Sequence, residues 1–391
     1  MEGRKWAMSQ TQMPRTRSRW REEAAAALLL ALCCGLWQAG GARAAGSPAG
    51  LFPGMFIFGD SLVDNGNNNF LATLARADFP PNGIDFGPGW PTGRFCNGRT
   101  IADYIGLMVG IDPVPAYLVL LQTEEGLEGF TNGVNFASGA AGILDDSGYN
   151  YLGRIPMSQQ LGYFANLKED LIARRGEEAT TKFLARALYF VVLGSNDYLN
   201  NYLQPNSAAR KVYSPKAYQD LLVTTFSQQL KAMYTIGARK ILLPGVGPLG
   251  CIPNELNVFK SANGSCIEDP VNKLVRGYNS AIKHAAELLV KRHKGLHILY
   301  ADAYKQLIAF TENSTKYGFV NADTSCCGQG NYGAEVPCIP TTPYCKDRDS
   351  YVFWDRHHPT DRANYLIANA YVYGSEDGAI SPMTILQLAA V

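Results

Sequence analysis

The stretch FIFGDSLVDNGNNN, residues 56–69, decides how the rest of the chain is interpreted. An apolar run breaks off in Gly-Asp-Ser, and four asparagines follow within the next eight residues. A short apolar run that ends in turn-forming residues is typical of a strand buried on both faces. The stretch therefore predicts a buried strand that ends by presenting the Ser61 hydroxyl. The asparagines Asn65, Asn67, Asn68 and Asn69 are expected to fix the loop that follows.

Apolar runs of the same kind recur along the chain, with helical spacing between them. In residues 214–237, Ser214 can cap a helix, Pro215 suits its first turn and Gly237 ends it. Residues 269–295 repeat this plan. Alternating strands and helices predict a doubly wound α/β sheet of about five mainly parallel strands. The five runs are MFIFG at 55–59, VNFAS at 134–138, LYFVVLG at 188–194, KILLPG at 240–245 and HILYAD at 297–302.

The first 44 residues have the pattern of a secretory signal peptide. Arginines precede the apolar core AAAALLLALCCGL, and Ala-Arg-Ala at 42–44 supplies the small-x-small cleavage pattern. The core is about a dozen residues, short of the ~20 that span a bilayer, so no stable membrane insertion is expected after cleavage. A retained anchor stays open as an alternative, as do starts at Met8 and Met13. Residues 45–391 are expected to form a single secreted domain, in the apoplast or cell wall.

Composition excludes one class of partner. The chain is 47% hydrophobic and 18% charged, with a net charge of +1. The leader holds seven of the 35 basic and three of the 34 acidic residues, which leaves 28 against 31, or −3. No basic stripe interleaved with aromatic residues is present, so no nucleic-acid partner is expected.

Seven cysteines remain after the leader, which in an oxidising compartment predicts disulfides and one free thiol. An alternative is that the four cysteines from Cys326 to Cys345 bind zinc. They lack paired C-x-x-C motifs and a nearby histidine pair, so no metal is expected. Asn263 and Asn313 begin N-glycosylation sequons, which suit a secreted chain.

The candidate site lies at the strand ends, because ligands of doubly wound sheets bind beyond the carboxyl ends of the strands. Ser61 follows the first run there, Gly139 the second and Asn196 the third. A lone serine in this position is more often a helix cap. As a nucleophile it needs a base within hydrogen-bond reach, because an unassisted hydroxyl scarcely ionises at neutral pH.

The base is expected in YVFWDRHHPTDRAN, residues 351–364, where two of the five histidines stand together. Asp355 precedes His358 by three residues, so its carboxylate can reach one imidazole nitrogen within a single turn. That contact would leave the other nitrogen free to take the proton of Ser61. The alternative is that Asp355 only caps a turn and that the histidines are exposed.

An attack on an ester carbonyl also requires hydrogen-bond donors for the oxyanion that forms. The backbone N–H of Gly139, the side-chain amide of Asn196 and the N–H of Ser61 itself are the candidates. An asparagine after a buried strand is otherwise a common turn former.

Taken together, these segments resemble the plant-type GDSL esterases/lipases of the SGNH hydrolase superfamily, over essentially the whole mature chain. The matching blocks are FIFGDSLVDNGNN, TNGVNFASGAAGIL, VVLGSNDYLNNY and WDRHHPT. The resemblance implies a three-layer α/β/α, flavodoxin-like fold, the SGNH hydrolase fold, without a cofactor. It also implies the catalytic residues Ser61, Asp355 and His358 and an oxyanion hole of Ser61, Gly139 and Asn196.

The chain departs from the family pattern at two positions. Family members often carry a second glycine where this chain has Ala140, and an apolar residue where it has His357. The D-x-x-H-P spacing of the family favours His358 as the base.

Disulfide connectivity stays open at this stage. Cys251 with Cys266 is a plausible pair, and Cys96 is the candidate free thiol. Local bridges are expected among Cys326, Cys327, Cys338 and Cys345.

A different motif, GVGPLG at 245–250, matches the dinucleotide-binding pattern G-x-G-x-x-G. Such a site needs a helix to open there, and Pro248 with Pro253 indicates a loop instead, so nucleotide binding is not expected.

The expected function is therefore hydrolysis of carboxylic esters of the lipid, cuticle or acylated-polysaccharide type, in a small-molecule or polymer substrate. An acyltransferase that uses the same triad and a catalytically silent secreted binding protein are the alternatives. The oligomeric state stays open.

Overall fold

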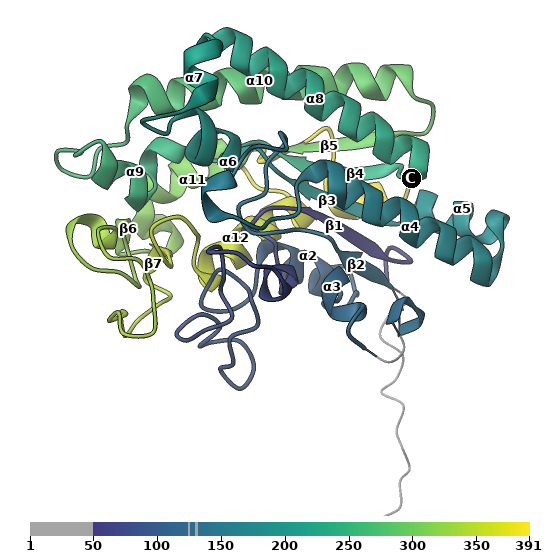
Figure 1. The fold of residues 1–391 in the computed structure, drawn as a ribbon, viewed down its shortest axis with the longest axis horizontal. Helices are drawn as coiled ribbons and strands as arrows, with labels where there is room; N and C mark the ends of the chain where they lie inside the picture. Colours follow the sequence, from purple (N-terminus) through teal and green to yellow (C-terminus); the bar gives the residue numbers. More distant parts are fainter. Residues whose placement is uncertain (1–49, 124–125, 130–131) are drawn as a thin grey trace, which may run out of the picture. The chain divides into compact units, whose positions relative to one another are not determined.

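A computed structural model describes residues 50–123, 126–129 and 132–391. Its centre is a six-stranded sheet in the order β2-β1-β3-β4-β5-β8 (Figure 1). Five neighbouring strands pair in parallel, and β8 closes one edge antiparallel to β5. The strands are β1 (Met55–Gly59), β2 (Gly133–Asn135), β3 (Leu188–Val192), β4 (Lys240–Pro244), β5 (His297–Ala301) and β8 (Ile380–Ser381).

The five predicted strands and the doubly wound α/β architecture are confirmed. The second strand is shorter than predicted and ends at Asn135, although the N–H groups of Phe136 and Ser138 still donate to the carbonyls of Ile57 and Gly59 in β1. The sixth strand, β8, was not predicted.

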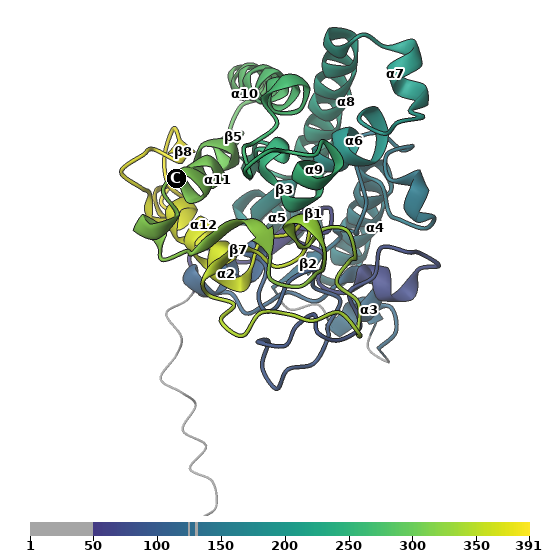
Figure 2. The ribbon, with the colours of Figure 1, turned by 90° about the vertical axis from the view of Figure 1, so that its left-hand side faces the viewer.

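Helices cover both faces of the sheet and make the outer layers (Figure 2). On one face α4 packs against β1 and α8, and α10 packs against α8 and β5. On the other face α2 packs against α12. These helices are α2 (Ile101–Met108), α4 (Met157–Arg175), α8 (Pro215–Ile236), α10 (Lys273–Arg292) and α12 (Asp361–Tyr373).

Side chains of the central strands point alternately to the two faces of the sheet and pack against the helices on each face. Phe56 and Phe58 both contact Phe164 of α4, at ring-centroid distances of 5.4 and 5.5 Å. Phe190 and Val192 of β3 instead line the cavity of the candidate site, together with residues of α12. Because strand side chains alternate between faces, each strand supplies both interfaces.

The predicted ends of the helix are confirmed for α8 and wrong for α10. Ser214 caps α8 by accepting the N–H of Ala217, and Gly237 ends it. The helix predicted from Asp269 begins as a short irregular turn, and α10 starts only at Lys273. Asp269 is extended because a residue before proline disfavours the helical region.

A separate two-stranded parallel sheet, also not predicted, pairs β6 (Asn321–Ser325) with β7 (Tyr351–Phe353). The segment that carries the candidate aspartate and histidine leaves β7 directly. The remaining helices are short or peripheral: α3 (Tyr117–Leu120), α5 (Glu177–Arg186), α6 (Ser195–Asp197), α7 (Ala208–Val212), α9 (Pro253–Val258), α11 (Ala303–Glu312) and α13 (Ile385–Ala389).

The cysteines of the described part of the chain pair as local bridges. The bonds are Cys251–Cys266, Cys326–Cys345 and Cys327–Cys338, and buried Cys96 is free. The pairing of Cys251 and the free thiol are therefore confirmed. The predicted signal peptide lies outside the described residues. Within the described ranges, no helix has the length and hydropathy of a membrane span.

Candidate active site

Ser61 follows β1 at the carboxyl edge of the sheet, and the backbone that leads into it is fixed by close packing and by hydrogen bonds. Gly59 is glycine because a Cβ would lie 2.7 Å from the carbonyl oxygen of Val192 and from the Val63 side chain. The buried amide of Gln160 accepts the N–H of Gly59 at 2.9 Å and donates to its carbonyl at 2.8 Å. Both polar groups at the end of β1 are therefore fixed two residues before the serine.

The asparagines after the serine do hold the loop, as predicted. Asn67 donates to the carbonyls of Asn135 and Ala137 and accepts the N–H of Leu118. Asn68 donates to the carbonyls of Ala75 and Gly139. Their side chains thus tie the loop after β1 to the segment after β2.

The loop after β7 closes on itself and so presents its side chains in a fixed direction. The N–H of Trp354 donates to the carbonyl of His358 at 2.8 Å, and Phe353 bridges Pro359. The buried indole of Trp354 donates to Asn82. The loop is therefore anchored to a segment more than 270 residues earlier in the chain.

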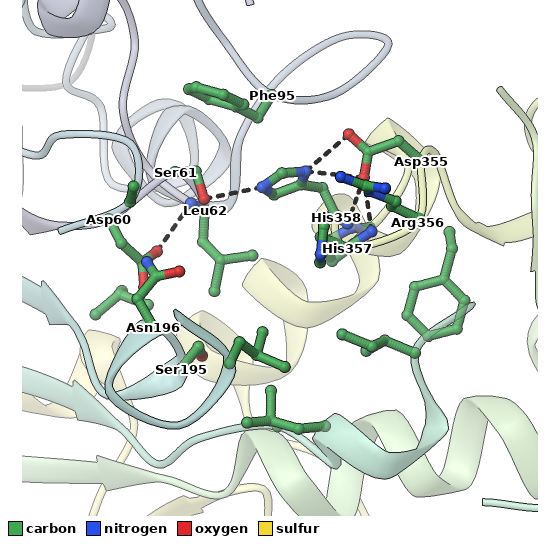
Figure 3. Close-up of a pocket in the computed structure, with 18 of the residues that line it drawn as sticks. Asp60, Ser61, Leu62, Phe95, Ser195, Asn196, Asp355, Arg356, His357 and His358 are labelled. Carbon is green, nitrogen blue, oxygen red and sulfur yellow. Dashed lines mark hydrogen bonds and ion pairs between the residues drawn. The ribbon is translucent and has the colours of Figure 1, made fainter. Parts of the chain in front are cut away.

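The structure brings Ser61, His358 and Asp355 into one chain of contacts (Figure 3). His358 Nε2 lies 2.8 Å from Ser61 Oγ, and His358 Nδ1 lies 2.8 Å from Asp355 Oδ2. Asp355 Oδ1 also accepts the N–H groups of His357 and His358. With the carboxylate on Nδ1, the neutral ring carries its proton there, and Nε2 is free to accept the serine proton.

The electrostatics of this loop favour a charged Asp355 and a neutral His357. Burial alone raises the pKa of Asp355, but the contact with His358 outweighs it and lowers that pKa to about 2. Burial lowers the pKa of His357 to about 3. His357 makes no hydrogen bond with Ser61 within the described chain, and its ring lies 5.9 Å from that of His358.

Gly139 does not join this group, which corrects its assignment as an oxyanion donor. Its N–H already donates to the buried carboxylate of Asp64, at 2.9 Å. A Cβ at this position would lie 2.7 Å from both Phe95 Cζ and Asn68 Nδ2. Gly139 is therefore glycine because of close packing under the site, next to the ring of Phe95, which lies 5.2 Å from that of His358.

The next residue, Ala140, lines the cavity, whereas Gly139 does not. Ala140 lines the same cavity as Ser61 and Asn196, and its backbone has a left-handed φ of 66°. The backbone N–H groups of Ser61 and Ala140 have no hydrogen-bond acceptor within the described chain. Asn196 donates one amide hydrogen to the carbonyl of Ala141 and accepts from Asn200, so its second amide hydrogen remains.

These groups line a cavity of about 320 Å³ whose remaining walls are mostly apolar. Figure 3 shows Ser61 between Asn196 on one side and His358 on the other. An apolar cavity with a few converging polar groups is the usual form of a small-ligand site. Its apolar wall includes Leu62, Leu74, Phe79, Phe95, Leu199, Leu249, Ile252 and Ile339.

Asp60, next to the serine, is a buried acid with an incomplete set of partners. Its Oδ1 accepts the N–H of Leu62, whereas its Oδ2 has no partner in the described structure. Burial raises the pKa of Asp60 to about 7. At pH 7 this carboxyl is therefore about half protonated, and below that pH it is mostly neutral.

The predicted glycosylation residues are not among those that line this cavity. Both sequon asparagines, Asn263 and Asn313, are exposed. The residues described contain no cluster of His, Cys, Asp and Glu suited to a metal ion. The G-x-G-x-x-G match at 245–250 runs into a 3-10 turn after Pro248 rather than an α-helix.

This fold, with a serine–histidine–aspartate contact at the carboxyl edge of its sheet, defines a class of hydrolases. The family model of the GDSL-like lipase/acylhydrolases matches residues 55–371, and the chain belongs to that family. It is accordingly a carboxylic ester hydrolase.

Curated relatives from Arabidopsis thaliana cover most of the chain. GDSL esterase/lipase 7 is 41% identical over 87% of this chain and 92% of its own. GDSL esterase/lipase At4g16230 is 42% identical over 86% of this chain and 91% of its own length. Among solved structures, LAE5, an α/β hydrolase enzyme from the metagenome of Lake Arreo, matches at 15% identity and a TM-score of 0.34, covering 82% of this chain and 95% of that one. So distant a likeness adds nothing to the assignment.

Proposed function

We propose that the chain is a secreted serine esterase in which Ser61, His358 and Asp355 form the catalytic triad. The observation that carries this proposal is the 2.8 Å contact between Ser61 Oγ and His358 Nε2, with Asp355 on the opposite nitrogen. A serine with a base at that distance, oriented by a third group, is the arrangement that nucleophilic catalysis requires.

The reaction takes two steps. Ser61 Oγ attacks the ester carbonyl while His358 takes its proton, and His358 then returns that proton to the leaving alcohol. The acyl group is now bonded to Ser61. In the second step His358 removes a proton from water, the hydroxide bonds to the acyl carbon, and the serine leaves with the proton.

The oxyanion of both steps is held by the N–H groups of Ser61 and Ala140 and the amide of Asn196. Their unused hydrogens and their common position on the cavity support this assignment. A prearranged donor of this kind typically contributes about 10²–10³ in rate.

The apolar walls of the cavity support an ester with an acyl chain, of the lipid or cuticle type, over a small polar acetate ester. An acylated polysaccharide remains a substrate only if its acyl group is apolar enough to enter. No cofactor takes part in this mechanism.

Replacement of the nucleophile tests the proposal. Ser61→Ala should lower kcat for p-nitrophenyl esters by at least about 10³, because the acyl-enzyme cannot form. A serine-directed phosphonate should label Ser61 of the folded wild type. In Ser195→Ala, whose serine lines the same cavity, the label should still be found on Ser61. Hydrolysis that survives in folded Ser61→Ala would overturn the assignment.

Secretion is part of the proposal and has its own test. Three disulfides and two exposed sequons suit an oxidising, glycosylating compartment. Protein recovered from the medium of expressing plant cells should begin at Ala45 and should lose mass on treatment with an N-glycanase, through Asn263 and Asn313. Retention of residues 1–44 in the cell-associated protein would contradict this.

A further inference from the structure

The two side chains between Asp355 and His358 have no role in the mechanism above. Arg356 and His357 stand between Asp355 and His358 in the chain, and both line the cavity with Ser61. Both are half-buried. Figure 3 shows them beside the triad, on the histidine side of the serine.

Arg356 is a cation without a counterion. Its guanidinium has no hydrogen-bond or ion-pair partner in the described part of the chain. Arg76 of the same cavity is paired with Asp78, which it contacts through two nitrogens. A partly desolvated arginine that the protein leaves unpaired keeps its donors for a ligand.

The acids near Arg356 do not neutralise it. Asp355 is engaged by His358 and by two backbone N–H groups. Asp60, the other acid of the cavity, has a pKa raised by burial to about 7. No carboxylate of the described chain therefore contacts the Arg356 guanidinium, whose donors remain for an anionic ligand.

His357 adds a neutral donor to the same place. Its ring nitrogens make no hydrogen bond within the described residues, and burial holds its pKa at about 3. A neutral imidazole carries one N–H, so it can donate beside the guanidinium without a second positive charge.

We propose that Arg356, assisted by His357, is an anion subsite, and that the preferred substrates are acyl esters whose alcohol carries a phosphate or a carboxylate. This inference rests on the proposed function, because the apolar wall holds the acyl chain and the triad sets the position of the ester. The anionic group lies near the ester bond, because Arg356 directly follows Asp355 and His358 is two residues further on.

A matched set of substrates tests the proposal. The kcat/KM of the wild type is measured, below the micelle concentration, for 1-decanoylglycerol, 1-decanoylglycerol 3-phosphate and 3-O-decanoylglycerate. Because a charge-assisted bidentate contact stabilises the bound anion, the phosphate ester should be preferred over the neutral ester by about 10- to 100-fold. If the carboxylate ester is preferred equally, the subsite accepts any anion. If only the phosphate ester is preferred, the subsite is specific for a phosphorylated alcohol.

Two variants assign the preference to one residue. Arg356→Gln should bring the anionic-to-neutral ratio to within about threefold of one, and Arg356→Lys should retain part of it. Arg76→Gln, the matched control, should keep the ratio. The proposal is overturned by a wild-type ratio near one, by a ratio that survives Arg356→Gln, or by a loss that occurs in Arg76→Gln instead.

A binding measurement separates this inference from the proposed function. Folded Ser61→Ala should bind decyl phosphate at least about tenfold more tightly than decan-1-ol, and the added Arg356→Gln change should remove the difference. If folded Ser61→Ala binds decyl phosphate more tightly but still hydrolyses esters, the anion subsite is supported and the triad is rejected. Ser61-dependent hydrolysis without any preference for anions would reject the subsite alone.

Discussion

A single buried carboxyl beside the nucleophile couples protonation to stability. Asp60 has one oxygen bonded to the N–H of Leu62 and one without a partner. Its ordinary pKa of 3.8 is raised by burial to about 7. Between these two values the folded chain holds a proton that the unfolded chain has released. The contribution of Asp60 to stability therefore falls as pH rises from about 4 to about 7.

Asp60→Asn should remove this pH dependence, because the amide stays neutral and can still accept from Leu62. The free energy of unfolding of the wild type should fall relative to that of Asp60→Asn as pH rises, with a limiting slope of about 1.4 kcal/mol per pH unit. Urea unfolding of both proteins at about pH 4.5, 6 and 8 measures the difference. Parallel curves would contradict the raised pKa.

The left-handed backbone of Ala140 gives a second prediction at this scale. Ala140→Gly keeps the N–H donor and removes the steric cost of a positive φ, so stability should rise by about 0.5–1 kcal/mol with kcat within about twofold. Thermal unfolding and ester hydrolysis check both expectations.

The neighbouring substitution is the contrast for that experiment. Gly139→Ala would place a methyl group against Phe95 and Asn68, so it should lower kcat by disturbing the ring beside His358. A harmless Gly139→Ala would show that the packing under the site is looser than described.

These two residues also show the limit of sequence reasoning about the site. Ser61, Asn196, Asp355 and His358 could be placed because strand ends and short spacings are local features. The N–H of Gly139 was expected to be open, because a glycine suggests an unobstructed donor. The partner of that N–H, Asp64, lies 75 positions away in sequence, and only the folded chain reveals the contact.

At the scale of elements, α4 positions the end of β1 through one side chain. Gln160 bonds both polar backbone groups of Gly59, yet it lies 101 positions away and has no motif around it. A buried glutamine in an otherwise amphipathic helix is the one signal that could have indicated a structural contact.

Gln160→Leu should leave the N–H of Gly59 buried without its side-chain acceptor. The expected loss of stability is about 1–3 kcal/mol, with a fall in kcat because the serine two residues on is less well placed. Denaturant unfolding and single-turnover acylation measure the two effects. Gln159→Leu is the matched control, since Gln159 bonds only to Tyr163 at the surface, and it should change neither quantity.

Whether a strand was predicted depended on whether its residues form a continuous apolar run. The five parallel strands are continuous apolar runs, and each was recognised. The strands β6, β7 and β8 were missed because β7 and β8 span three and two residues and β6 reads NADTS. Such segments have no periodicity of their own, and tertiary pairing alone makes them strands.

At the scale of the whole molecule, the cysteine-rich segment supports the histidine loop. The N–H of Cys326 donates to the carbonyl of Phe353, and that of Cys327 donates to the carbonyl of Trp354. The two bridges of this segment therefore restrain the strand that leads into Asp355.

Cys327→Ala with Cys338→Ala should lower stability by about 2–3 kcal/mol, since the bridge closes a loop of 11 residues. The fall in kcat at a temperature where the protein is still folded should exceed that of Leu171→Ala, a core truncation in α4 with a comparable stability loss. Equal kcat in both variants would show that the bridge stabilises the fold without restraining the catalytic loop.

The contact between Ser61 and His358 joins positions 297 apart, so the hydroxyl is translated early and the imidazole late. A ribosome that stops early, or an allele with a premature termination codon before position 358, releases a polypeptide that cannot assemble the catalytic centre. Turnover is therefore an assay for complete synthesis, because a fragment that ends before His358 lacks the base that the proposed reaction needs.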